Sequence, residues 1–263
     1  MTVNSSSTSE TSLWQELRNR ARSSLLKLGW DVRRAVNQQD TARQKWQQRE
    51  QEKWRVLQMY QPATVLDIGA NTGHFALLTR ELLSKTRIIS FEPLRDCYEA
   101  LQRQSASLSP HEVLPYALGE TDGVAVIQRN EFSPSSSLLL MGTLHAEELP
   151  YTAKTVAEEI QLRRLDGLAE SLVLTDPLVV KIDVQGYTLP VLRGGENTIR
   201  RAQAVIAEVS VQPLYSGEAS FNDVYTLMTQ WGFAYRGNVD QWCSQRDGRI
   251  LQCDCLFEKV ATQ

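Results

Sequence analysis

The sequence predicts an α/β protein built on a doubly wound, mostly parallel sheet that is preceded by a helical extension. Two apolar stretches are each followed by a glycine turn: residues 64–68, which contain an acidic residue, and residues 178–182, which precede one. A third apolar stretch covers residues 204–209. Segments with the periodicity of amphipathic helices separate these stretches. Strands that alternate with helices are typical of parallel sheets covered on both faces.

The composition is that of a folded domain. The chain has 263 residues, 42% of them apolar and 22% charged, which indicates one large domain with an appendage rather than a disordered chain. It contains no run of about 18 apolar residues, so no transmembrane segment is predicted. A net charge of −3 gives no electrostatic case for binding nucleic acid. The four cysteines show neither disulfide nor metal-site spacing, and we interpret them as reduced thiols of a cytoplasmic protein.

The first 60 residues differ from the rest of the chain. Residues 1–12 are rich in Ser and Thr and lack the basic and apolar regions of a secretory signal, so we expect a flexible tail. Residues 13–60 predict two helices, with eleven Lys or Arg against five Asp or Glu between positions 14 and 55. We interpret this extension as a solvated helical cover on one edge of the domain. A lid, a homodimerisation arm, and a contact with an acidic partner or a membrane surface are the alternatives.

Residues 64–75 combine a buried strand, a tight turn and the start of a helix. Asp67 precedes the first glycine of the turn, Gly69, and places a negative charge beside it. A phosphate-binding turn presents bare N–H groups to an anion, whereas this turn suits a ligand with a cationic amine or sulfonium. The spacing to Gly73 also departs from the dinucleotide motif, because Asn71 stands where the second glycine is expected. S-adenosylmethionine therefore fits this turn better than NAD does.

A second acidic residue supports the same ligand. Residues 87–91 predict the next strand, and Glu92 follows it directly, 19 residues after Gly73. Doubly wound folds place an acid near this position, where it accepts hydrogen bonds from ribose hydroxyls. Ordinary turn or capping acids are the alternative interpretation of Asp67 and Glu92. Their joint spacing favours a nucleoside site.

The middle of the chain interrupts the alternation of strands and helices. Residues 112–118 predict a third strand, whose end places Ala117 beside the nucleoside pocket on topological grounds. Residues 124–128 and 159–163 alternate as a half-exposed antiparallel pair does, and a Ser-rich loop lies between them. His145 follows that loop and is either an incidental histidine or a base for the acceptor.

The second acidic strand end is Asp183, which follows residues 178–182 and precedes a turn at Gly186. A helix over residues 188–200 and a buried strand ending near Glu208 are predicted next. The chain then closes with a helix and an antiparallel hairpin. The acids after these strands are expected along one rim of the sheet, where open α/β sheets bind their ligands.

Five segments carry a family resemblance: residues 65–73, 91–93, 181–186, 191–194 and 231–233. Together they resemble the FkbM family of class I S-adenosylmethionine-dependent methyltransferases, many of which O-methylate sugar or polyketide hydroxyls. The resemblance implies a Rossmann-like sheet of seven strands with an antiparallel last strand. It also implies a methyltransferase domain over residues 61–263, with an insertion at about residues 120–177, and a small-molecule or glycan acceptor.

The resemblance assigns roles to individual residues as well. The turn after the first strand would hold the methionine end of the cofactor, through Asp67, Gly69, Ala70, Asn71 and Gly73. Glu92 would bind the ribose. Gln185 departs from the family, which more often has Glu at that position.

Methyl transfer to a hydroxyl also needs a base within hydrogen-bond reach. Asp183 is the first candidate because it ends a core strand beside the expected cofactor; His145 is second and His74 third. Cofactor positioning is the alternative role for Asp183. No metal is expected, although Asp183 and Glu208 have the chemistry to hold Mg²⁺. We therefore predict an O-methyltransferase, with an N-methyltransferase, a non-catalytic cofactor- or partner-binding module and a nicotinamide-dependent oxidoreductase as alternatives.

Overall fold

The computed structural model of the protein describes residues 44–260. Residues 53–260 belong to one compact unit, and residues 44–52, which are helical, belong to a separate one. The tail predicted for residues 1–12 and most of the predicted helical extension lie outside the described residues. In the described part, no helix is both long enough and apolar enough to cross a membrane.

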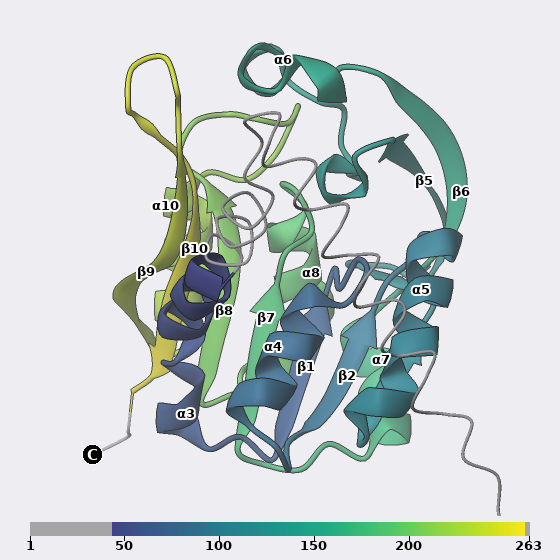
Figure 1. Cartoon of the computed structure of the whole chain (residues 1–263), viewed down its shortest axis with the longest axis vertical. Helices are drawn as coiled ribbons and strands as arrows, with labels where there is room; N and C mark the ends of the chain where they lie inside the picture. The colour runs from purple at the N-terminus through teal and green to yellow at the C-terminus, as the bar shows by residue number, and fades with distance from the viewer. Residues whose placement is uncertain (1–43, 261–263) are drawn as a thin grey trace, which may run out of the picture. The chain divides into compact units, whose positions relative to one another are not determined.

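The compact unit is organised around a seven-stranded sheet (Figure 1). Its strand order is β3–β2–β1–β7–β8–β10–β9, and neighbours are parallel except that β10 runs antiparallel to β8 and β9. The strands are β1 (Thr64–Ile68), β2 (Arg87–Phe91), β3 (His111–Leu114), β7 (Leu178–Ile182), β8 (Ala204–Ser210), β9 (Phe233–Cys243) and β10 (Ile250–Lys259). The predicted doubly wound sheet of seven strands is confirmed. Its strand order reverses between β1 and β7, which is where such sheets bind ligands.

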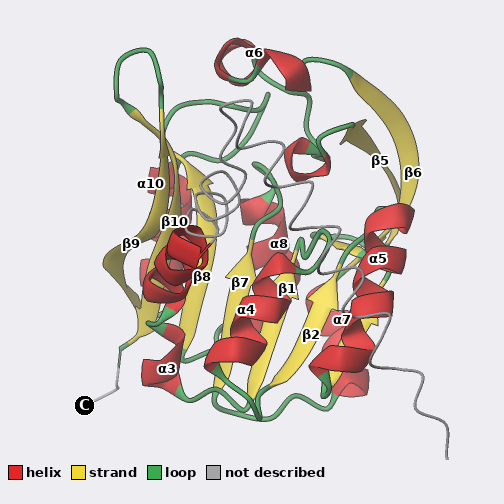
Figure 2. Cartoon of the chain, viewed as in Figure 1, coloured by secondary structure: helices red, strands yellow, loops and turns green. Residues whose placement is uncertain are grey.

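Helices cover both faces of this sheet (Figures 1 and 2). Leu66 and Ile68 of β1 pack with α7, α8 and α10 on one face, whereas Val65 packs with α3 and α4 on the other. The helices are α3 (Leu57–Tyr60), α4 (His74–Leu82), α5 (Arg95–Ser105), α6 (Thr143–Glu148), α7 (Leu165–Leu172), α8 (Thr188–Gly194), α9 (Glu196–Ile199) and α10 (Phe221–Gln230). All of β1 is buried, as expected for a strand covered on both sides.

The residues just before β1 pack as part of the sheet domain. Trp54, Leu57 and Tyr60 are buried in one apolar cluster with Phe75 of α4, and the Trp54 and Phe75 rings meet edge to face with 4.9 Å between centroids. The Tyr60 hydroxyl donates a hydrogen bond to Glu258 of β10 at 2.5 Å. The compact unit therefore starts eight residues before the predicted domain start at residue 61.

The insertion forms a small second sheet with the order β4–β6–β5. Its strands are β4 (Ala117–Leu118), β5 (Gly123–Asn130) and β6 (Thr155–Arg163). The predicted antiparallel pair is confirmed as β5 and β6. The single strand predicted over residues 112–118 is wrong, because β3 belongs to the large sheet and β4 to the small one. Pro115 lies between them and has no N–H with which to continue a ladder.

The helix predicted over residues 188–200 is divided into α8 and α9. Gly195 lies between them, and its N–H bonds to the carbonyls of Val191 and Leu192. Glycine has a low helix propensity, which explains a break at this point. The predicted terminal hairpin is confirmed as β9 and β10.

Candidate active site

The candidate site lies where the strand order reverses, between the carboxyl ends of β1 and β7. Gly69 follows β1 with a φ of +84°, and a Cβ at this position would overlap the carbonyl oxygen of Asp183. Only glycine permits this approach. The Asp183 N–H donates to the Ile68 carbonyl at 2.9 Å, and the Gly69 N–H donates to the Phe91 carbonyl at 3.0 Å. The ends of β1, β2 and β7 therefore meet at one point.

The turn after Gly69 is held from three directions. Asn71 adopts a φ of +48°, and its N–H donates to Glu92 Oε2 at 2.8 Å. The Asn71 side-chain amide donates to Ser133 Oγ at 3.0 Å, so the Ser-rich loop of the insertion closes against the turn. Gly73 then starts α4 with a φ of +89°, where a Cβ would overlap the side chain of Leu101. The turn is thus fixed by the acid after β2, by the insertion and by α5.

Glu92 is a buried carboxylate with hydrogen-bonding capacity to spare. It is 4% exposed, and its two oxygens accept the N–H groups of Asn71 and Leu94, each at 2.8 Å. Burial raises its pKa to about 7, although those two N–H bonds favour the charged form. A carboxylate has about four acceptor sites, so two remain for ligand hydroxyls.

These residues border a pocket of about 720 Å³, part of which is open to solvent. Five of the predicted site residues line it: Gly69, Asn71, Glu92, Ala117 and Asp183. Its apolar lining includes Phe91, Leu94, Leu118, Ile127 and Leu138, and the Ser-rich loop contributes Ser133, Ser136 and Ser137. A pocket of this size, mostly apolar with a few polar groups, suits a small-molecule ligand.

Three residues predicted to bind the cofactor, Asp67, Ala70 and Gly73, are not among those that line this pocket. Asp67 is fully buried. Ser90 donates to its Oδ2 at 3.3 Å, and its Oδ1 has no hydrogen-bond partner among the described residues. Burial raises the pKa of Asp67 to about 6, against the influence of the Lys181 ammonium. Asp67 is therefore a buried neighbour of the pocket.

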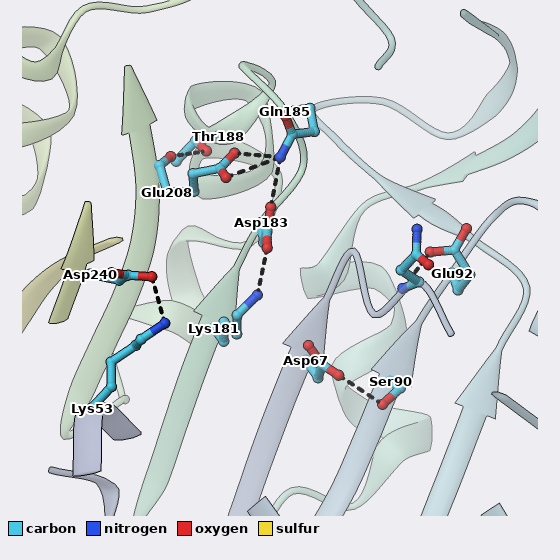
Figure 3. Close-up of polar contacts among 11 residues, drawn as sticks. Lys53, Asp67, Ser90, Glu92, Lys181, Asp183, Gln185, Thr188, Glu208 and Asp240 are labelled. Atoms are coloured by element: carbon cyan, nitrogen blue, oxygen red, sulfur yellow. Dashed lines mark hydrogen bonds and ion pairs between the residues drawn. The ribbon is translucent and has the colours of Figure 1, made fainter. Parts of the chain in front are cut away.

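Four polar side chains form a continuous hydrogen-bonded row beside the pocket (Figure 3). Lys181 Nζ donates to Asp183 Oδ2 at 2.9 Å. Gln185 Nε2 donates to Asp183 Oδ1 at 3.0 Å and lies 2.9 and 3.0 Å from the two oxygens of Glu208. Lys181 is buried, and its Nζ lies 5.2 Å from the centroid of the Phe75 ring. The row joins the end of β7 to β8.

The two carboxyl groups of this row ionise differently. Burial opposes ionisation of Asp183, but the Lys181 ammonium and the hydrogen bonds from Lys181 and Gln185 outweigh it, so the pKa of Asp183 is lowered. Burial and the charges of Asp183 and Asp254 raise the pKa of Glu208 well above its usual range. Asp183 is thus the ionised member, and its side chain is 33% exposed.

Gln185 is oriented by residues that the sequence did not single out. Its Oε1 accepts a hydrogen bond from the Tyr215 hydroxyl at 2.9 Å, and its carbonyl accepts one from Ser137 Oγ at 2.6 Å. With Oε1 held by Tyr215, the Nε2 donor faces Asp183 and Glu208. Ser137 belongs to the Ser-rich loop noted from composition, but no spacing in the sequence connects Tyr215 with Gln185.

The two histidines considered as bases are not among the residues that line the pocket. His145 lies in α6 and is 2% exposed, with its ring centroid 5.2 Å from that of Tyr215 and 5.6 Å from that of Trp242. Its Nδ1 lies 3.3 Å from Thr152 Oγ1, and burial lowers its pKa. His74 is exposed at the first position of α4. Asp183 is the only one of the three base candidates on the pocket wall.

The strand order, the antiparallel β10 and the pocket at the reversal point define an α/β protein of the class I methyltransferase type. The chain also matches the family model of the methyltransferase FkbM domain over residues 67–235. That match covers more than half of the chain, and the protein belongs to this family. The resemblance seen in the sequence is confirmed.

Two curated relatives are similar in sequence. The hexuronic acid methyltransferase AglP of Haloferax volcanii is 31% identical over 54% of this chain and 54% of its own length. The 2-O-methyltransferase NoeI of Sinorhizobium fredii is 25% identical over 62% of this chain and 70% of its own. The match thus spans about half the length of the first relative. Among solved structures, the magnesium protoporphyrin IX methyltransferase of Synechocystis has a TM-score of 0.45 and 12% identity, covering 92% of this chain and 96% of that one.

Because the chain belongs to this family, its cofactor is S-adenosylmethionine. The pocket has the chemistry that this cofactor needs. Glu92 and Asp183 supply carboxylates, which suit hydroxyls and cationic groups, while Ala117, Leu118 and Leu94 supply an apolar wall that suits a flat base.

Proposed function

We propose that this methyltransferase O-methylates a hydroxyl of a sugar, glycan or polyketide-type natural product, with Asp183 as the base. The observation that carries the proposal is the position of Asp183. It follows β7 on the pocket wall beside the Gly69 turn, is partly exposed, and is kept ionised by Lys181. A base must reach the proton that it accepts and must be unprotonated at the working pH.

The cofactor residues follow from the same geometry. Glu92 would accept hydrogen bonds from the ribose hydroxyls, the wall that includes Ala117 would contact the adenine, and the turn at Gly69 and Asn71 would hold the methionine end. When bound, S-adenosylmethionine supplies an electrophilic methyl group on a sulfonium. Asp67 and Gly73 would shape the turn from behind, since neither lines the pocket.

Asp183 would hold the acceptor hydroxyl and take its proton. Lys181 and Gln185 fix the carboxylate by one hydrogen bond to each oxygen, which leaves acceptor sites for the incoming hydroxyl. Positioning an acceptor in line is worth up to about 7–11 kcal/mol in ideal cases. A positioned base adds roughly 10²–10⁴-fold. His145 is the weaker candidate because it is buried among aromatic rings.

Two lines of support favour a hydroxyl acceptor. The names of the two relatives describe a hexuronic acid methyltransferase and a 2-O-methyltransferase. An anionic base that is hydrogen-bonded at both oxygens also suits a neutral hydroxyl, whose proton must leave during transfer. An N-methyltransferase differs only in the acceptor atom, and the product of the assay below distinguishes the two.

The test compares Asp183→Asn with Asp122→Asn, the same substitution on a loop before β5. Labelled methyl transfer from S-adenosylmethionine is screened over hydroxylated saccharides and polyketide alcohols, and the methylated atom is identified by tandem mass spectrometry. We expect Asp183→Asn to lower turnover by about 10²–10⁴-fold and Asp122→Asn to leave it unchanged. Binding of S-adenosylhomocysteine should stay within a few-fold in both variants. Unchanged turnover in Asp183→Asn would remove it from the base role, and methylated nitrogen would overturn the O-methyltransferase assignment.

A further inference from the structure

Three carboxyl side chains stand in one row across three neighbouring strands. Asp254 of β10 is directly opposite Glu208 of β8 on one side and Asp240 of β9 on the other. Residues paired in this way project from the same face of a sheet, with Cβ atoms roughly 4.5–5.5 Å apart. Like charges placed directly opposite each other destabilise a sheet. Burial and the charges of Asp183 and Asp254 raise the pKa of Glu208 for this reason, and the fold keeps an unfavourable arrangement at this position.

Neighbouring groups satisfy the carboxyl groups of this row only in part. Lys53 Nζ forms an ion pair with Asp240 at 2.6 Å, and Glu208 accepts a hydrogen bond from the Gln185 amide (Figure 3). By contrast, no side-chain hydrogen bond or ion pair joins the Asp254 carboxyl group to another residue between 44 and 260, although its backbone lies within the β10 ladders. Burial and the charges of Asp183 and Asp240 raise its pKa to about 7, although Lys181 and Lys53 favour its charged form. One cation bound at Asp254 would neutralise its carboxylate and relieve the repulsion within the row.

The row lines a second hollow, of about 590 Å³ including its opening, which we call the acidic pocket. Its lining residues are Glu208, Asp240, Gln241, Trp242, Gln252, Cys253 and Asp254. Gln252 provides evidence of a different kind. It is 8% exposed, and its Nε2 has no hydrogen-bond partner among the described residues. A buried amide donor without a partner is unfavourable unless a ligand supplies an acceptor.

The chemistry of the acidic pocket selects among ligands. No group of three or more metal-binding side chains in residues 44–260 is arranged to hold a metal ion, which favours an organic cation. An ammonium group satisfies carboxylates through charge-assisted hydrogen bonds. The Trp242 ring in the same wall also attracts cations and packs against apolar ring faces. The Nε2 donor of Gln252 would be satisfied by an oxygen acceptor next to the ammonium group of the ligand.

We propose that the acidic pocket binds the methyl acceptor through a protonated amine held by Asp254 and Glu208, with a neighbouring hydroxyl oxygen on Gln252. This inference rests on the proposed function, because it names a property of the same acceptor. Glu208 connects the two pockets, since it lines the acidic pocket and bonds to Gln185, which lines the cofactor pocket. An acceptor anchored at Glu208 therefore reaches towards Asp183. Conversely, the row repels an acceptor that carries a carboxylate, so the acceptor class proposed here differs from the hexuronic acid in the name of the Haloferax relative.

The experiment titrates the ¹⁵N-labelled full-length protein with three related monosaccharides at neutral pH. D-glucosamine carries the amine, D-glucose is neutral, and D-glucuronate is anionic. Binding is followed at the indole N–H of Trp242, assigned by its loss in Trp242→Phe. We expect glucosamine to bind at least about tenfold more tightly than glucose, and glucuronate not to bind. Equal affinity for glucosamine and glucose would overturn the proposal.

Two variants separate binding from folding. Asp254→Asn should remove the preference for glucosamine while raising the thermal midpoint by about 2–4 °C, because the repulsion within the row is relieved. Glu159→Gln removes a carboxylate from an exposed position on β6 and should keep the preference. A preference that persists in Asp254→Asn would contradict the proposal. The titration requires neither cofactor nor turnover, so its failure leaves methyl transfer intact, and failure of S-adenosylhomocysteine binding leaves the titration readable.

Discussion

Asp67 and Asp183 belong to neighbouring strands and look alike in the sequence, yet the structure gives them opposite properties. Each lies at or just after the end of a buried strand and is followed by a glycine turn. Asp67 is fully buried, has one oxygen without a partner among residues 44–260, and has a pKa raised to about 6. Asp183 is partly exposed, has both oxygens hydrogen-bonded, and has a lowered pKa.

The difference comes from neighbours rather than from the acids themselves. Lys181 lies opposite Asp67 in the parallel ladder but donates its hydrogen bond to Asp183. Gln185 adds a second donor to Asp183, whereas in the described part of the chain the Asp67 carboxyl group has one donor, the Ser90 hydroxyl. One buried lysine thus separates a charged acid on the pocket wall from a poorly solvated acid behind it. A shared sequence pattern, an acid at a strand end before a glycine turn, thus determines the position of the acid in the fold but not its protonation state.

Lys181→Met is the substitution with the largest expected effect on the difference between Asp67 and Asp183. Removing one partner of a buried ion pair leaves an uncompensated charge, and we expect the free energy of unfolding to fall by about 3 kcal/mol. The pKa of Asp183 should rise, so turnover should fall most steeply at acidic pH. Chemical denaturation and a pH–rate profile measure the two effects. Lys85→Met, at an exposed position before β2, is the matched control. Wild-type stability in Lys181→Met would show that this lysine does not control the pair.

Glu92→Gln tests whether a buried acid at the next strand end binds the cofactor. Loss of charge-assisted hydrogen bonds to the ribose should weaken S-adenosylhomocysteine binding by about 10- to 100-fold in calorimetry. Glu112→Gln, on β3 in an ion pair with Arg87, is the control and should bind normally. Unaltered affinity in Glu92→Gln would mean that Glu92 serves only to hold the backbone of Asn71 and Leu94.

Asp67→Asn should have the smallest effect on cofactor binding and turnover, and it should be visible mainly in the pH dependence of stability. The folded pKa of about 6 lies above the ordinary aspartate value of about 3.9, so the native state keeps a proton that the unfolded state has lost. The unfolding free energy of the wild type therefore falls as pH rises through this window, by on the order of 3 kcal/mol from this group. The variant should lose that part of the slope, as measured by denaturation at a series of pH values. An unchanged slope would contradict a raised pKa at Asp67, and Asp122→Asn serves as the control.

Much of the fold could be predicted because its strands are short, apolar and bounded by turn residues. The sheet, the β5–β6 pair and the terminal hairpin all follow from periodicity. The division of residues 112–118 between two sheets was missed, although Pro115 marks it, because proline signals a break without saying which sheet each half joins.

The site was predictable only in part. Gly69, Asn71, Glu92, Ala117 and Asp183 were identified at strand ends, and the structure brings them to one pocket. The contacts of Tyr215 with Gln185 and of Ser133 with Asn71 join residues far apart in the chain, which no spacing rule connects. The acid row across β8, β10 and β9 depends on strand register, and a shift of one residue would place its members on opposite faces.

Asp183 is the charged acid of the pair, and a titration of the two carboxyl groups tests this assignment. ¹³C-carboxyl aspartate can be incorporated, and the two resonances assigned from their loss in Asp183→Asn and Asp67→Asn. We predict that Asp183 titrates below the ordinary aspartate range and that Asp67 titrates near pH 6, so the two curves are well separated. Coincident curves, or Asp67 titrating below Asp183, would contradict the account and remove the electrostatic basis for Asp183 as the base.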